Sequence, residues 1–450
     1  MSDGLEFLKH YLRFATVSAD PSGAEPSSAC CRWLSETLGS WGMQAGVHST
    51  AGGPVVVART PHVENAMRVL VYGHYDVQPA EPLDLWQSGA FEPEVREGMI
   101  YARGATDNKG QTASLLLGIR DLIKSGTLDA NVTVLLEGEE EIGSPSLQDF
   151  LNRSKDDLEC DVVLIADTSM IKEGLPALTL GLRGIVCMEV KVHGAAADLH
   201  SGMFGGAVPN PAMVLAKVLG RMTDANGVIA IPAFYEGSIE IPSEEREAWA
   251  ALPWDDAWFQ NATGIAPAGE RGTTAIERAW GRPTAEINGL TSGHQGEGSK
   301  TIIPATAAAK LSFRLVPGQD PQRIAAITAR WFEEQCAAEG AKGIAVCDHV
   351  GEPFYTSPEN PFLRRAADAL EEVFRVAPAL TREGLSIPAA VMLQKTLDVP
   401  VILVGLGLPD CQAHAPNECF PVAHLELGAE FVKRFLAQRR CGAAVDLDVR

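Results

Sequence analysis

The sequence lacks the features that mark secreted, membrane-spanning and nucleic-acid-binding proteins. Its nine cysteines are an odd number without a CxxC pair, which argues against a disulfide framework and a structural zinc knuckle. Basic residues are few, with 37 Lys and Arg against 58 Asp and Glu and a formal net charge of −21, so nucleic acid and anionic lipid are poor partners. No apolar run reaches the roughly 18 residues of a membrane span, and the N-terminal segment has no apolar signal core. We therefore expect a soluble, cytoplasmic protein.

The length and the hydrophobic content predict a chain of more than one domain with a large core. It has 450 residues, of which 46% are hydrophobic. Four short apolar runs are typical of strands buried on both faces of a parallel sheet: residues 67–72, 131–136, 161–166 and 399–404. The segment 109–124 is rich in Leu and Ala and predicts a crossover helix, so the pattern indicates an open α/β sheet.

The middle of the chain has a different pattern. Residues 186–193 and 311–315 alternate apolar and polar side chains, as in a sheet with one solvated face. Helices are expected over residues 211–222 and after Asp320. We therefore predict an α+β insertion at residues 184–353 between the two parts of an α/β domain, residues 1–183 and 354–450. Residues 223–306 are rich in Pro, Gly and Trp and give no order of elements.

Acidic and histidine side chains follow the strand-like segments. They are His74 and Asp76, Asp107 after the segment 99–106, Glu139 to Glu141, Asp167, and His414. Ligands of open α/β sheets bind at the carboxyl ends of strands. A single Asp after a strand is usually a helix cap, but several carboxylates at one sheet edge need a countercharge, and Arg103 and Lys109 cannot neutralise them all. A His, Asp and Glu set without Cys predicts zinc, manganese or cobalt rather than calcium or magnesium.

Eight motifs strengthen this interpretation: GHYDVQP (73–79), YARGATDNKG (101–110), LEGEEEIGS (136–144), GLRG (181–184), DLHSGMFGG (198–206), EGSKTIIP (297–304), FRLVP (313–317) and REGLSIP (382–388). In this order, within residues 5–437, the chain resembles the two-metal family of aminoacylases, carboxypeptidase G and cytosolic dipeptidases. The motifs are most similar to those of the cytosolic nonspecific dipeptidase and carnosinase branch. The resemblance implies an exopeptidase-type catalytic domain with a mostly parallel sheet, and an inserted ferredoxin-like domain that acts as a lid and dimerises.

The resemblance implies a site for two divalent ions per subunit, Zn²⁺ or Mn²⁺. Asp107 would bridge the ions. One ion would also bind His74 and Asp167, and the other would bind Glu141 and His414. The Asp107–Asn108 bond resembles a cis peptide known in this family.

The resemblance also implies how the neighbouring acidic residues act. Glu140 would be the general base that takes a proton from a metal-activated water and returns it to the leaving amine. Asp76 would accept a hydrogen bond from His74 and fix its tautomer. Glu139 would have no role.

Four further residues are expected at the substrate. His200 resembles a histidine that reaches the developing oxyanion from the partner subunit, so the resemblance implies a homodimer. Arg314 would bind the terminal carboxylate of the substrate, with Thr301 and Ser386 as further contacts. By residue type alone, His200 is an ordinary loop residue, Arg314 a solvated strand residue, and the two hydroxyls backbone caps.

The sequence therefore predicts a two-metal hydrolase for small amides with a free carboxylate, with dipeptides as the expected substrates. The alternative is an N-acyl amino acid deacylase of the deacetylase or desuccinylase type, which shares all the metal ligands. A metal-binding scaffold without catalysis is a third possibility, but it would have no need of Glu140.

Two departures from the branch pattern leave the substrate open. Leu385 stands where the branch has the second glycine of GGSIP, and Cys411 and Cys419 flank His414 in CQAHAPNEC. Free cysteines in such positions are usually small buried hydrophobic residues.

Overall fold

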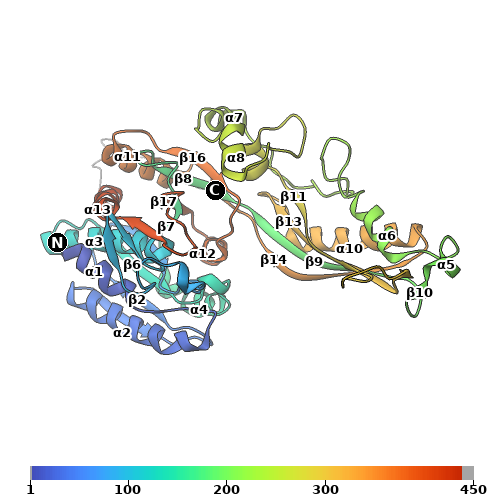
Figure 1. The fold of residues 1–450 in the computed structure, drawn as a ribbon. Coiled ribbons are helices and arrows are strands. Elements are labelled where there is room, and N and C mark those ends of the chain that lie inside the picture. Colours follow the sequence, from blue (N-terminus) through green and yellow to red (C-terminus); the bar gives the residue numbers. More distant parts are fainter. Residues whose placement is uncertain (1–2, 438–450) are drawn as a thin grey trace. The chain divides into compact units, whose positions relative to one another are not determined.

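The computed structural model describes residues 3–437 (Figure 1). Cys441 and the end of the predicted segment 354–450 lie outside the described residues. The chain forms two compact units. Unit 1 contains the residues up to Leu180, residues 356–379 and those from Ile387 onward, and unit 2 contains residues 181–355 and 380–386. The predicted insertion, residues 184–353, falls inside unit 2, and its function as a lid and dimerisation domain stays a prediction.

The sheet of unit 1 has a parallel centre. Its order is β1 (Gln44–His48), β2 (Val55–Arg59), β6 (Ala130–Glu137), β3 (Met67–His74), β7 (Val162–Ser169), β17 (Val401–Gly407) and β8 (Ala177–Leu182). The four predicted strands are β3, β6, β7 and β17, which lie side by side and parallel, whereas β1, β2 and β8 pair antiparallel. The predicted α/β class is confirmed.

Helices lie in two groups around this sheet (Figure 1). The helix α3 (Gly110–Ser125) packs on α13 (Val422–Leu436), which also contacts α1 (Asp3–Leu12) and α11 (Pro361–Phe374). In the other group, α2 (Ala24–Ser40) packs on β1 and β2, and α4 (Leu147–Ser154) packs on α12 (Pro388–Leu397). None of the helices between residues 3 and 437 combines the length and the apolarity that crossing a bilayer requires.

One expectation about the sheet is wrong. The segment 99–106 is expected to be a strand that ends before Asp107. Only β5 (Met99–Tyr101) is extended, and it pairs antiparallel with β4 (Glu94–Arg96) and β18 (Cys419–Pro421) in a small separate sheet. The chain then turns, because Gly104 has a φ of +81° and its carbonyl accepts a hydrogen bond from the backbone N–H of Lys109. Asp107 therefore lies in the turn Ala105–Lys109 before α3 and not at a strand end.

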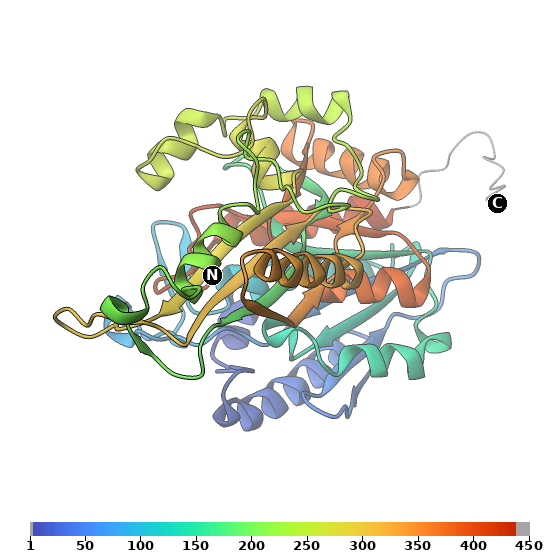
Figure 2. The same ribbon diagram turned by 90° about the vertical axis from the view of Figure 1, so that its right-hand side faces the viewer.

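The sheet of unit 2 is antiparallel, in the order β11 (Thr284–Ser292), β13 (Thr306–Leu315), β9 (Gly184–His193) and β14 (Lys342–Gly351). Its apolar face packs on α6 (Pro211–Leu219) and α10 (Pro321–Ala338), which lie in front of the strands in Figure 2. The alternation in β9 and β13 produces this face, as predicted. The sequence does not predict the strand β11, because it is an edge strand without a buried residue and so has no apolar alternation.

The remaining elements of unit 2 are short. They are β10 (Leu199–His200), α5 (Ser201–Phe204), α7 (Ser243–Ala250), α8 (Asp256–Thr263), α9 (Ala275–Trp280), β12 (Ile302–Ile303), β15 (Phe354–Tyr355) and most of β16 (Ala379–Glu383). The strands β10 and β12 pair with each other.

Candidate metal centre

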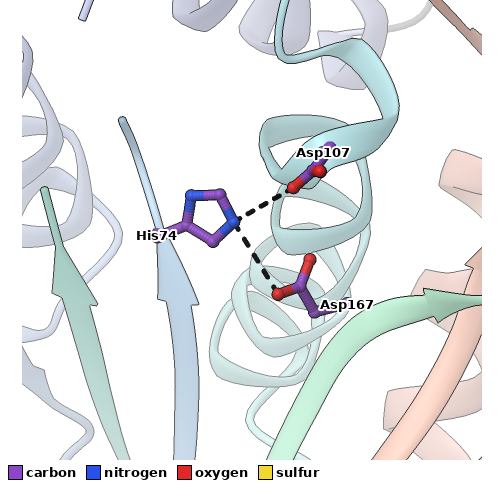
Figure 3. A group of neighbouring side chains, drawn as sticks. All are labelled: His74, Asp107 and Asp167. Carbon is purple, nitrogen blue, oxygen red and sulfur yellow. Dashed lines mark ion pairs between the residues drawn. The ribbon is translucent and has the colours of Figure 1, made fainter. Parts of the chain in front are cut away.

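The first group of candidate ligands gathers around His74, the last residue of β3. Because β3 and β7 are parallel neighbours, the end of β3 lies beside Asp167 in β7. His74 is fully buried, and its Nε2 atom lies 3.2 Å from Oδ1 of Asp107 and 3.7 Å from Oδ2 of Asp167. Figure 3 shows the imidazole pointing at both carboxylates. These three side chains are close enough to share one cation.

The second group forms around the other oxygen of Asp107. Nε2 of His414 lies 2.9 Å from Oδ2 of Asp107 and 3.2 Å from Oε2 of Glu141. Glu141 belongs to the turn Glu140–Ile142 after β6, and His414 to the loop between β17 and β18. Asp107 thus directs one carboxylate oxygen to each group, which is the arrangement that a bridging ligand needs.

The electrostatics of the two groups fit cations. Burial raises the pKa of Glu140 well above its usual value, and the carboxylates of Asp167 and Asp107 add to the shift. Burial also raises the pKa of Asp167 to about 6. Hydrogen bonds to Asp107 and Glu141 raise the pKa of His414 to about 10. Such shifts arise where several carboxylates are buried close together, because burial and mutual repulsion disfavour their negative charges and a nearby positive charge stabilises them.

Within residues 3–437, two buried atoms of the candidate ligands also have no hydrogen-bond partner, namely Nε2 of His74 and Oε1 of Glu141. A buried polar atom without a partner is costly. A bound metal ion would satisfy both atoms, so the residues present fit a two-metal site.

The neighbouring basic side chains are occupied elsewhere. Arg103 pairs with the buried carboxylate of Glu418 at 2.8 Å. Nζ of Lys109 donates to the carbonyl oxygens of Phe14, at 2.8 Å, and Tyr11, at 3.4 Å. Neither side chain therefore supplies a countercharge to the two ligand groups.

Asp76 connects the end of β3 to the turn after β6. Its Oδ1 atom lies 3.3 Å from Nδ1 of His74, and the Asp76 carbonyl oxygen lies 3.1 Å from the same nitrogen. Its two carboxylate oxygens accept hydrogen bonds from the backbone N–H groups of Glu140, at 3.2 Å, and Glu141, at 3.1 Å. The sequence predicted only the contact to His74, because the position of the turn depends on the pairing of β3 with β6.

Glu418 and Asn108, whose side chains have no role in the sequence analysis, hold the turn of Asp107. The buried carboxylate of Glu418 accepts hydrogen bonds from the backbone N–H groups of Gly104, Thr106 and Asp107 at 2.8 to 3.0 Å. Asn108 donates to Oδ1 of Asp167 at 2.7 Å. The Asp107–Asn108 peptide bond is cis. In the sequence, Glu418 is recognisable only as the glutamate of CQAHAPNEC, after His414. That motif does not show which backbone N–H groups its carboxylate binds.

The predicted substrate residues lie in unit 2, in separate places. His200 and Thr301 are both exposed. His200 pairs with Ile302, the residue after Thr301, and the Thr301 carbonyl oxygen accepts a hydrogen bond from the N–H of Ser201 at 3.0 Å. Ser386 is half-buried in the loop before α12. Between residues 3 and 437 no hydrogen bond or ion pair joins Arg314 to Thr301 or Ser386.

A cavity of about 790 Å³ in unit 2 contains Arg314 and a second arginine that the sequence reasoning missed, Arg183. Among the described residues, neither guanidinium has a carboxylate within 4.0 Å, and Nε of Arg183 is buried without a partner. Burial and the charge of Arg314 lower the pKa of Arg183 to about 10. The backbone N–H of Arg183 also binds the carbonyl oxygens of Glu383 and Leu385, and the Leu385 side chain is 64% exposed.

Comparisons with known proteins match most of the chain. A model of peptidase family M20/M25/M40 matches residues 70–438. The Cys-Gly metallodipeptidase DUG1 of Candida albicans is 30% identical over 391 residues, which are 85% of this chain and 81% of that protein. The Beta-Ala-His dipeptidase of Rattus norvegicus is 30% identical over 391 residues, 85% of this chain and 78% of that protein. The solved structure of an M20 family metallo-carboxypeptidase, Sso-CP2 from Sulfolobus solfataricus, has a TM-score of 0.82 and 30% identity, and covers 97% of this chain and 99% of that one.

Proposed function

Because the chain belongs to peptidase family M20/M25/M40, we propose that it hydrolyses the amide bond of dipeptides at a centre of two metal ions. The observation that carries this proposal is the position of Asp107, whose two oxygens face two separate ligand groups. The relatives named above support dipeptides, since two of them are dipeptidases of different specificity, for Cys-Gly and for Beta-Ala-His.

The proposed ligands are His74, Asp107 and Asp167 for one ion, and Asp107, Glu141 and His414 for the other. The donor set of imidazoles and carboxylates favours Zn²⁺ or Mn²⁺. When bound, such ions lower the pKa of a water molecule and polarise the carbonyl of the substrate.

Glu140 is the proposed general base. It is adjacent to the ligand Glu141 in the turn after β6, and its backbone N–H is held by Asp76. Burial raises the pKa of its carboxyl, which makes the ionised carboxylate a stronger base. Glu140 would therefore take the proton of the attacking water and deliver it to the nitrogen of the leaving amine.

Asp76→Asn should weaken metal binding about 10–100-fold. The asparagine keeps one acceptor oxygen, but its NH₂ group replaces the other and cannot accept a hydrogen bond from a backbone N–H of the turn. The turn of Glu140 and Glu141 therefore loses a hydrogen bond, and the His74 ring is held less firmly. Titration of the metal-free chain with Zn²⁺ measures the change. The control is Asp84→Asn, an exposed residue outside both ligand groups. Equal affinities of the two variants would contradict the positioning role of Asp76.

Arg314 is the proposed partner of the terminal carboxylate of the substrate, with Thr301 and Ser386 as further contacts. The support is its guanidinium, which lines a cavity without a carboxylate partner among residues 3–437. Arg314→Lys should lower kcat/KM for a good dipeptide by about 10–100-fold, chiefly through KM, because lysine loses the two-pronged hydrogen bond. Lys310→Arg on the same strand is the control. An unchanged KM in Arg314→Lys would exclude this contact.

Unit 2 is the proposed lid and dimerisation domain, with His200 acting at the oxyanion of a partner subunit. The support is the exposure of His200, whose Nδ1 accepts a hydrogen bond from the N–H of Gly202 at 3.0 Å and whose Nε2 has no such bond among the described residues. Light scattering of the purified chain should give twice the mass of 48.0 kDa. A monomer with full activity would disprove a role for His200 across subunits.

The substrate proposal is tested with two pools, one of dipeptides and one of N-acyl amino acids. The metal-free chain is reloaded separately with Zn²⁺ or Mn²⁺, and substrate loss is followed by mass spectrometry. Loss of dipeptides alone, restored by metal, supports the proposal, whereas loss of the acylated pool alone assigns deacylation instead. Tripeptides in the first pool test whether longer substrates are accepted. The cytoplasmic location stays a prediction, and cell fractionation tests it.

A further inference from the structure

Two cysteines lie at the base of the loop that carries His414. This loop, residues 411–419, follows β17, and its last residue, Cys419, is the first residue of β18. Eight of the cysteines are in the described part of the chain, and the thiols of Cys411 and Cys419 are close enough for each to shift the pKa of the other. Neither cysteine belongs to a group of candidate metal ligands. The proximity of the two thiols therefore points to a role other than metal binding.

The backbone holds this pair close enough for a disulfide. The N–H of Cys419 donates to the carbonyl oxygen of Cys411 at 3.0 Å. This backbone hydrogen bond keeps the Cα atoms of the two residues near each other, as a disulfide requires with its Cα separation of about 4.4–6.8 Å. Sγ of Cys411 also accepts a hydrogen bond from the N–H of Leu408 at 3.4 Å, which fixes the direction of its side chain.

The loop above the pair has an unfavourable backbone. Three of its non-glycine residues have a left-handed φ: Gln412 at 56°, His414 at 61° and Asn417 at 64°. Such residues persist where surrounding contacts over-determine them. The C-terminal end of the loop is held through Nδ2 of Asn417, which donates to the Leu85 carbonyl oxygen at 2.8 Å. A covalent bond between Cys411 and Cys419 would tie the N-terminal end of the loop to its C-terminal end, which the Asn417 hydrogen bond already holds.

We propose that Cys411 and Cys419 form a disulfide by exchange with a low-molecular-weight disulfide, such as oxidised glutathione, and that this bond locks the loop of His414. One cysteine thiolate attacks a sulfur of the glutathione disulfide, breaks its S–S bond and releases one glutathione. The second thiolate attacks the mixed disulfide and releases the other glutathione. Both cysteines are oxidised, the glutathione disulfide is reduced, and the two thiol protons go to the two glutathione thiolates.

Access to the thiols sets the rate. Cys411 is 1% and Cys419 5% exposed, whereas Gln412, Ala413 and His414 above them are exposed. The oxidant therefore reaches the thiols when the loop opens. We expect this cross-link to form more slowly than glutathione adds to the exposed Cys347.

Peptide mapping of the full chain tests the disulfide. The protein is incubated with oxidised glutathione, its free thiols are alkylated, and its peptides are analysed by mass spectrometry. The expected product joins Cys411 to Cys419 with the loss of two hydrogens, and a reductant reverses it. Cys347→Ser should retain the cross-link and Cys411→Ser should lose it. If the unsubstituted chain gives only free thiols or glutathione adducts at these two positions, the proposal is wrong, whether or not Cys411→Ser folds.

The locking role has a separate readout, which rests on the proposed metal centre. After reloading with Zn²⁺, the oxidised chain should lose metal to a chelator about tenfold more slowly than the reduced chain, because His414 is less free to swing away. A cross-link with unchanged metal release would overturn the locking role. A chain that binds no Zn²⁺ in either form would count against the proposed function, while the cross-link would still be read from mass.

Discussion

Glu140→Gln is expected to lower kcat/KM for the preferred dipeptide by about 10²–10⁴-fold and to leave two metal ions bound per chain. Glutamine has the shape of the glutamate but cannot take a proton from water. The turn itself should survive, because Asp76 holds the backbone N–H of residue 140 and not its side chain. Steady-state kinetics and elemental analysis of the same sample measure both quantities.

Glu139→Gln is the matched control, since Glu139 is the adjacent acidic residue, is buried, and belongs to neither ligand group. This variant should keep the turnover of the unsubstituted chain. If Glu139→Gln were inactive and Glu140→Gln active, the two glutamates would have exchanged roles. Loss of metal in Glu140→Gln would instead make Glu140 a ligand.

Asp107→Asn is the second substitution with a large expected effect. Its carboxylate faces both ligand groups, at 3.2 Å from His74 and 2.9 Å from His414. The amide offers one oxygen and one NH₂ group, so one ion loses an anionic ligand and the two cations lose the charge between them. Metal content should fall to one ion per chain or fewer, and kcat/KM should fall by at least about 10³-fold.

The control for Asp107→Asn is Asp121→Asn, on the helix that follows the turn of Asp107. Asp121 pairs with Arg120 at 2.9 Å and with Lys433 at 3.0 Å, away from both ligand groups. This variant should bind two ions and keep its activity. Thermal unfolding with and without Zn²⁺ separates a folding defect from a metal defect, because only the metal defect removes the stabilisation by Zn²⁺. Two ions retained in Asp107→Asn would exclude bridging.

Much of the architecture could be predicted because strands with buried faces carry apolar residues in runs or alternation that can be read from the sequence. The four central strands were found as apolar runs bounded by polar residues, and β9 and β13 as alternations. The edge strand β11 escaped because it has no buried residue. The prediction that residues 99–106 form one strand before Asp107 is wrong, because only Met99–Tyr101 are extended and three residues do not show which sheet they join.

The sequence by itself determined which side chains are available to the proposed metal centre, since residues at the ends of neighbouring parallel strands meet wherever that sheet forms. His74, Glu141 and Asp167 follow from this rule. Only the tertiary structure decided that Asp107 turns one oxygen to each group, that Asp76 supports the turn of Glu140, and that Glu418 holds the turn of Asp107. These contacts join segments far apart in the chain. Their distances depend on how the strands and loops pair, and no local periodicity contains that information.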